Sequence, residues 1–196
     1  AKGNASLRGK SGRLYVVRGD NLSNFLSTFV AVSQKSGLAP QAGLIASDTP
    51  NAFATTNQDR QIVLLSIPML EKIGTDRDAL ATTLGHEIAH LYLRHREARQ
   101  QRSDSARGIS NVLGLALGIA GVPMSGSIAS LGVGTVTAVY TRDEEREADI
   151  LGLKWAMAAG YSACGSARTM RMLKSLSASS PLPFLSSHPA HDERIE

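Results

Sequence analysis

Residues 85–90 read Gly-His-Glu-Ile-Ala-His, and this stretch is the strongest indication of the fold. In an α-helix, His86 and His90 lie one turn apart on the same face, where two imidazoles can bind one metal ion. Glu87 would point toward the open side of that metal, where it could accept a proton from a water molecule. The pattern is typical of zinc metallopeptidases.

The residues around this motif predict a buried amphipathic helix. Apolar residues form one face, and charged residues of the appropriate sign stand at each end, where they suit the helix dipole. The apolar positions are Leu80, Ala81, Leu84, Ile88, Ala89 and Leu91, the acidic ones Asp76 and Asp78, and the basic ones Arg94, Arg96 and Arg99. A pattern this short also occurs by chance, and the alternative is a pair of histidines hydrogen-bonded inside a helical core.

The composition predicts one globular domain. The chain has 196 residues, 42% of them hydrophobic, and we expect a flexible N-terminal arm at 1–13 and a single domain at 14–196. The net charge is +4, but the basic residues are scattered and only 5% of residues are aromatic, so no nucleic-acid partner is predicted. Cys164 is the only cysteine in the sequence, which excludes an internal disulfide and a thiolate zinc cluster.

Periodicity along the chain predicts an α+β fold that is mainly helical, with a small β-sheet before the motif helix. Helices are expected at 21–37, 142–160 and 166–176, and strands at 43–47 and 61–67.

The stretch between Arg107 and Thr141 carries no charged residue. A membrane-spanning helix needs about 20 continuous apolar residues, and Ser, Gly and Pro123 interrupt every such window here. We therefore favour a segment that is buried or covers the active site, with membrane association through 108–141 as the open alternative.

A catalytic zinc ion of this kind needs a third protein ligand and keeps its fourth position for water. The pattern with a third histidine requires histidine at 96 and glycine at 93, where this chain has Arg96 and Leu93, so that class is excluded. His95 is on a different helix face from His86 and His90, and we expect it to be exposed or to cap the helix.

A glutamate on a second helix is the other common third ligand. Residues 144–149, Glu-Glu-Arg-Glu-Ala-Asp, provide candidates, and Glu145 and Asp149 share a helix face. Glu145 could bind the metal while Asp149 accepts the second ring N–H of a ligand histidine and fixes its tautomer. The alternative is a solvated, charged helix face.

Four ordered motifs resemble the HtpX-like family of zinc metallopeptidases, which includes the CAAX prenyl proteases, and the likeness is nearest to its soluble periplasmic quality-control members. The motifs are Pro50-Asn51-Ala52-Phe53-Ala54, the stretch from Gly85 to His95, the stretch from Glu145 to Asp149, and Ser187-His188-Pro189 followed by Arg194. The likeness covers most of the chain from about Phe29 onward.

The resemblance implies a zincin-like metallopeptidase domain of the gluzincin type, with its small β-sheet next to the active-site helix. By this resemblance the chain binds one Zn²⁺ through His86, His90 and Glu145. Glu87 is then the general base, and Asp149 supports a ligand histidine.

The resemblance also implies a substrate-binding edge strand, whose residues are Asn51, Ala52, Phe53 and Ala54. His188 is expected near the metal, where it would either block the open position or help to stabilise the transition state. Arg194 would support the developing oxyanion or anchor the tail. Glu144 and Glu147 would be bystanders.

These observations predict a zinc-dependent endopeptidase that hydrolyses unfolded or extended polypeptides. The relatives suggest a role in protein quality control in the bacterial cell envelope, periplasmic or membrane-associated. The alternative is a latent protein of the same fold that acts as a chaperone or an assembly scaffold.

Overall fold

The computed structural model describes residues 3–9, 12–102, 104–105, 140–178 and 182–188. Its strands are β1 (Ala5–Arg8), β2 (Leu14–Val17), β3 (Gln41–Ile45), β4 (Ala52–Asn57) and β5 (Arg60–Ser66). Its labelled helices are α1 (Gly19–Ser36), α2 (Ile67–Ile73), α3 (Arg77–Tyr92), α6 (Arg142–Ala158), α7 (Cys164–Ser177) and α8 (Pro183–Ser187), and residues 95–102 are also helical. The mixed fold, mainly helical with small sheets, is confirmed, and each predicted helix and strand is present with its ends shifted by a few residues.

Local signals in the sequence account for the helix ends. The Asp76 side chain caps α3 by accepting a hydrogen bond from the backbone N–H of Ala79. Thr141 and Glu144 form a capping box at the start of α6. Gly37 ends α1 in the left-handed region at φ 73°, which glycine adopts without strain.

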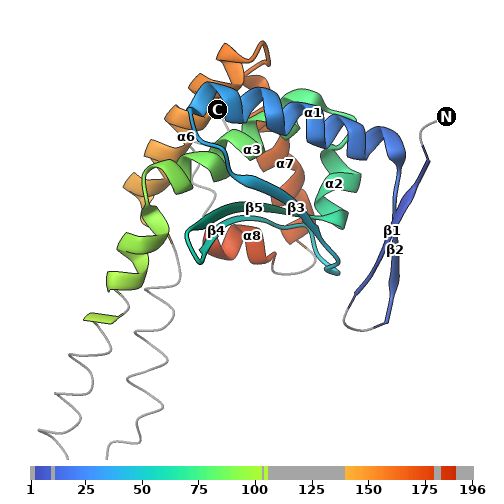
Figure 1. Cartoon of the computed structure of the whole chain (residues 1–196), viewed down its shortest axis with the longest axis horizontal. Coiled ribbons are helices and arrows are strands. Elements are labelled where there is room, and N and C mark those ends of the chain that lie inside the picture. Colours follow the sequence, from blue (N-terminus) through green and yellow to red (C-terminus); the bar gives the residue numbers. More distant parts are fainter. Residues whose placement is uncertain (1–2, 10–11, 103, 106–139, 179–181, 189–196) are drawn as a thin grey trace, which may run out of the picture.

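The larger sheet has three strands in the order β3-β5-β4. The central strand β5 pairs in parallel with β3 and antiparallel with β4. Helices α1 and α3 lie over one face of this sheet (Figure 1). Strand β4 therefore lies at an edge of the sheet, within the part of the chain that the structure describes.

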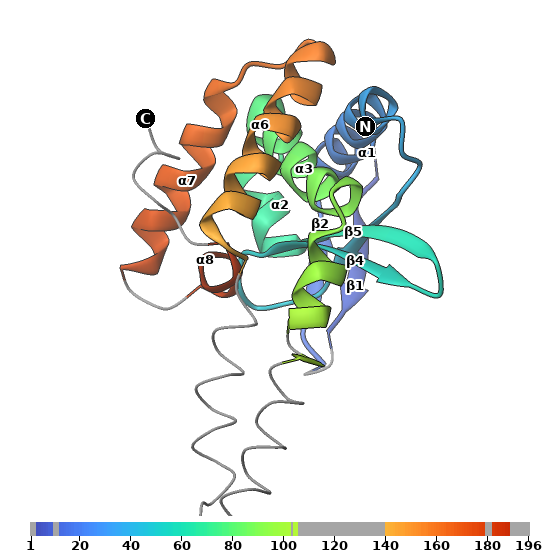
Figure 2. The same cartoon turned by 90° about the vertical axis from the view of Figure 1, so that its left-hand side faces the viewer.

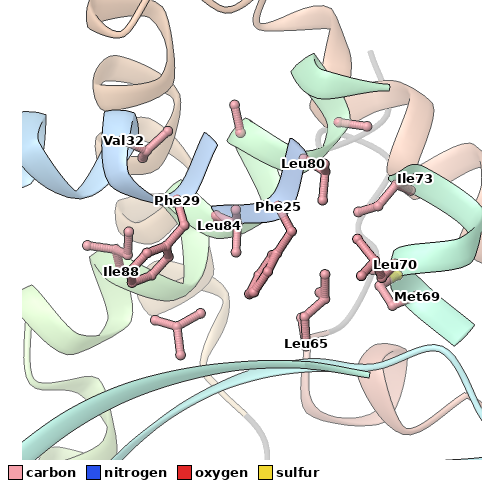
Figure 3. Packing of buried hydrophobic residues seen from close by; sticks show 14 of the residues in the cluster. Phe25, Phe29, Val32, Leu65, Met69, Leu70, Ile73, Leu80, Leu84 and Ile88 are labelled. Carbon is pink, nitrogen blue, oxygen red and sulfur yellow. The ribbon is translucent and has the colours of Figure 1, made fainter. Parts of the chain in front are cut away.

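Helix α3 is the central helix of the fold. It packs against α1, α6 and α7, and Figure 2 shows it between α1 and α6. Figure 3 shows the core between α1, α3 and the sheet, where Phe25 and Phe29 lie beside Leu84 and Ile88, with Leu65 of β5 facing them. Burying each such side chain stabilises the fold by about 1.5–3 kcal/mol. The helix that carries the histidine motif is thus held on several sides.

Strands β1 and β2 project together from the side of the helical body (Figure 1). Strand β1 pairs antiparallel with β2 and is mostly exposed. The expected arm at 1–13 therefore includes a strand, and the domain boundary after it stays a prediction.

The uncharged stretch lies almost entirely outside the described residues, which resume at Tyr140. The two expectations for 108–141, a cleft cover and a membrane contact, thus stay predictions. Among the helices of the described ranges, none is long and apolar enough to cross a bilayer.

Candidate metal centre

Three helices bring the predicted site residues together. Helix α3 carries His86, Glu87 and His90, α6 carries Glu145, and His188 follows α8 as its C-cap residue. All five side chains are buried, at most 5% exposed. Polar side chains gathered at this depth require a common partner or extensive hydrogen bonding.

Four of these residues each offer one donor atom, and the four atoms lie within 4.8 Å of one another. The Nε2 atoms of His86 and His90 are 3.0 Å apart, and His90 Nε2 lies 3.3 Å from Glu145 Oε1. The Nδ1 atom of His188 lies 3.2 Å from His86 Nε2 and 2.8 Å from Glu145 Oε1. Two ligand atoms on a tetrahedral zinc ion are about 3.3 Å apart, so this spacing suits a metal ion.

Glu87 supplies independent support for a metal. Both of its carboxylate oxygens are buried and have no hydrogen-bond partner among the residues that the structure describes, and the residue is 0% exposed. The Nε2 atom of His188 lies 3.6 Å from Glu87 Oε1. A buried carboxylate without a hydrogen-bond partner is destabilising, so its place on α3 next to His86 fits a site that receives a further group.

The electrostatics of the donors also suit metal binding. Burial lowers the pKa of His90 well below its ordinary value, and His86 and His188 add to this effect while Glu145 opposes it. Burial alone would raise the pKa of Glu145, but hydrogen bonds and charge contacts with His188, His86 and His90 outweigh it and lower that pKa. A neutral imidazole and an ionised carboxylate are the forms that bind metals.

Asp149 lies behind His86, as the motif spacing predicts. Its Oδ1 atom is 2.8 Å from His86 Nδ1. Since a carboxylate accepts, the His86 Nδ1–H donates, and the lone pair of Nε2 faces the cluster.

Two glycines set the distance between α3 and α6. A Cβ atom on Gly152 would lie 2.5 Å from the backbone N of His86, and one on Gly85 would lie 2.5 Å from the Gly152 carbonyl oxygen. The backbones of the two ligand-bearing helices are therefore in direct contact, which fixes the spacing of His86 and His90 relative to Glu145.

The predicted substrate strand is present in part. Strand β4 begins at Ala52, and Asn51 precedes it, with its backbone hydrogen-bonded to Ser66. Ala52 and Ala54 are buried, Phe53 is half-buried, and β4 contacts α3. The binding role of Asn51 to Ala54 stays a prediction, as does that of Arg194, which lies outside the described residues.

The expectation for His95 was wrong. It is buried, 5% exposed, with its Nδ1 atom 2.9 Å from His90 Nδ1 and its Nε2 atom 3.3 Å from Glu147 Oε2. Helix α3 ends at Tyr92, and Arg94 adopts a left-handed φ of 55°. Because the chain turns there, the helical wheel that placed His95 on another face does not extend to it.

The neighbouring glutamates, expected to be bystanders, are outside the group of four donors but have contacts of their own. Glu147 contacts His95, as described above. Glu144 is buried, caps α6, and accepts two hydrogen bonds from Arg102 at 2.8 and 3.0 Å. Burial alone would raise the pKa of Glu144, but the contacts with Arg102 and Thr141 lower it.

Tyr140 is a site residue that the sequence analysis missed. Its ring stacks on His90 with centroids 3.9 Å apart, and it is 5% exposed. Burial, with Glu87 next in effect, raises its pKa above the ordinary value. No local pattern marks it, because the fourth helical residue, with which an apolar residue before the N-cap usually pairs, is the polar Glu145.

Comparison with known proteins gives consistent results. Residues 21–196 match the model of peptidase family M48. The chain is similar to the metalloprotease YcaL of Escherichia coli (strain K12), with 27% identity over 58% of the chain and 44% of that protein. It is similar to the protease HtpX of Cellvibrio japonicus (strain Ueda107), with 37% identity over 34% of the chain and 22% of that protein.

A eukaryotic relative covers more of the chain. The mitochondrial metalloendopeptidase OMA1 of Schizosaccharomyces pombe (strain 972 / ATCC 24843) is 28% identical over 89% of the chain and 50% of that protein. The chain thus spans half or less of the length of these relatives.

Proposed function

Because the chain belongs to peptidase family M48, we propose that it is a zinc-dependent endopeptidase that hydrolyses peptide bonds in unfolded or extended polypeptides. The observation that carries this proposal is Glu87, a fully buried carboxylate that follows the donor residue His86 on α3, lies 3.6 Å from His188 Nε2, and has no hydrogen-bond partner in the described ranges. A general base of a hydrolase needs such a position.

The residues take separate roles in this proposal. His86, His90 and Glu145 hold the metal, which when bound polarises the scissile carbonyl and makes water more acidic. Glu87 accepts the proton of the attacking water and passes it to the leaving amine nitrogen as the C–N bond breaks. Asp149 holds the ring of His86 in the tautomer that binds the metal.

The edge strand supports an extended substrate. Strand β4 pairs with β5 on one side, and in the described part of the chain no strand pairs with its other side. A substrate segment that adds to this edge must be extended, which segments of unfolded proteins can become. We place the enzyme in the bacterial cell envelope, in protein quality control, on its resemblance to periplasmic members of the family; recovery in the cytosolic fraction of the source cell would contradict this.

The test is hydrolysis of a fluorescence-quenched, unfolded casein by the purified protein. Cleavage is expected with zinc, is expected to stop with a chelator, and is expected to return when zinc is added back. Mass spectrometry of the products should show internal cuts. Cleavage that persists in chelator, or its absence from protein that carries zinc, would contradict the proposal.

His188 offers a second test, because it is one of the four residues that could hold the metal. A tetrahedral metal held by all four donors would be closed to substrate, and we propose that His188 leaves this closed form before substrate binds. If this closed form holds about nine-tenths of the molecules, His188→Ala should raise kcat/KM on the casein by about tenfold. A fall in kcat/KM with the zinc content unchanged would show instead that His188 takes part in catalysis.

The same closed ligand set favours one alternative, a latent protein that holds clients without cutting them. Glu87 is needed by the enzyme and not by the scaffold. If the protein is a scaffold, the wild type and Glu87→Gln should bind unfolded casein equally well, and neither should cleave it. Chelator-sensitive cleavage by the wild type would exclude this alternative.

A further inference from the structure

The two ligand histidines of α3 are supported in different ways. The ring N–H of His86 reaches a carboxylate directly, that of Asp149. The corresponding nitrogen of His90, Nδ1, lies 2.9 Å from His95 Nδ1 instead. On its other side, His95 Nε2 lies 3.3 Å from Glu147 Oε2. A hydrogen-bonded series of side chains thus runs from His90 in the metal centre through His95 to Glu147 at the surface.

The direction of the hydrogen bonds in this series follows from Glu147, the residue at its outer end. The carboxylate of Glu147 can only accept, so the Nε2–H of His95 donates to it. In this tautomer His95 carries its lone pair on Nδ1, which accepts from the Nδ1–H of His90. This leaves the lone pair of His90 on Nε2, the atom that lies 3.0 Å from His86 Nε2 in the donor cluster.

We infer that His95 and Glu147 are positioning residues that fix the tautomer and orientation of His90 for metal binding. The inference rests on the proposed metal role of His90. It gives each ligand histidine a carboxylate from α6, Asp149 directly for His86 and Glu147 through His95 for His90.

The backbone and the surroundings favour a positioning role over simple core filling. Arg94 holds the left-handed conformation that turns His95 back toward His90, and strained residues of this kind concentrate at functional sites. The ring of Tyr140 stacks on His90 at 3.9 Å, so the imidazole is fixed by a ring contact as well as by a hydrogen bond. His90 and His95 are 1% and 5% exposed, so water does not replace His95 as the acceptor.

The experiment measures zinc affinity by competition with a fluorescent chelator, and the visible spectrum of the cobalt-loaded protein. His95→Leu removes the acceptor, and a fall in zinc affinity of about 10–100-fold with a changed cobalt spectrum is expected. His95→Asn keeps an oxygen near the position of Nδ1 and should stay within about threefold of wild type.

Glu147, at the outer end of this hydrogen-bonded series, provides a variant that does not disturb the core. The Glu147 side chain is 62% exposed, so Glu147→Ala should fold normally, and a smaller loss of zinc affinity, about three- to tenfold, is expected. Its control is Asp143→Ala, which removes a carboxylate that is 87% exposed on the same helix and should leave affinity and spectrum unchanged. If His95→Leu fails to fold, this pair decides the question.

Three results would separate the possible failures. Unchanged zinc affinity and cobalt spectrum in Glu147→Ala and in folded His95→Leu would overturn the positioning role. Equal losses in His95→Asn and His95→Leu would also overturn it, since packing alone would then explain both. A wild-type protein that binds zinc but cleaves no polypeptide would contradict the proposed function and leave this inference standing.

Discussion

Glu87→Gln is expected to lower kcat/KM on unfolded casein by about 10²–10⁴-fold, because a carboxamide cannot accept the proton of the attacking water. Glutamine has nearly the same shape as glutamate, so the packing around this fully buried residue should be kept. Glu87 is outside the set of four clustered donors, and the zinc content should therefore stay at one ion per chain. Steady-state kinetics, zinc analysis and a thermal melt of the same preparation measure the three quantities.

The matched control is Glu71→Gln, the same chemical change at an exposed position of α2. It should leave kcat/KM, zinc content and Tm unchanged. Turnover by Glu87→Gln close to that of wild type would show that another group takes the proton, and it would remove the main support for the proposed mechanism.

Glu145→Gln is expected to have the second large effect, the loss of bound zinc and of the stability that zinc provides. Glu145 is the only anion among the four clustered donors, and its carboxylate oxygens lie 2.8 to 3.6 Å from donor atoms of all three histidines. At a free zinc concentration of 1,000 times Kd, binding stabilises the fold by about 4 kcal/mol, which for a chain of this size is roughly 10 °C in Tm. The wild type should therefore melt about 10 °C lower in chelator, whereas the variant should melt at the same temperature with and without it.

The neighbouring residue supplies the control for this variant. Glu144→Gln changes the adjacent carboxylate but keeps a side chain that can cap α6, so the protein should keep its zinc and its sensitivity to chelator. A Glu145→Gln protein that retains stoichiometric zinc would contradict the assignment of Glu145 as a ligand.

The parts of the site that follow local rules could be predicted from the sequence. His86 and His90 on one face of α3, and Glu145 and Asp149 on one face of α6, depend only on helical periodicity, and the structure places them as expected. The resemblance placed His188 near the metal, although 102 residues separate it in sequence from His86. Periodicity alone could not have done so, because that contact depends on how α8 packs.

The missed residues depend on contacts that no local pattern encodes. His95 reaches His90 because of one left-handed residue, Arg94, and a non-glycine residue gives no sequence signal for that conformation. Tyr140 stands at the end of an uncharged stretch, and only the packing of α6 brings its ring onto His90. Apolar character was also an incomplete guide to burial in α1, where Leu26 and Val30 are 48% and 52% exposed.

The contact between Gly85 and Gly152 separates the three donors on α3 and α6 from the fourth donor, His188. Three donors are carried by helices whose backbones already touch, so their spacing cannot shorten, and a side chain at either glycine would widen it. His188 follows a helix of five residues, α8, which takes no part in this glycine contact. The α3–α6 contact therefore sets the positions of three of the four donors relative to one another, and the position of His188 is set separately, by the packing of α8.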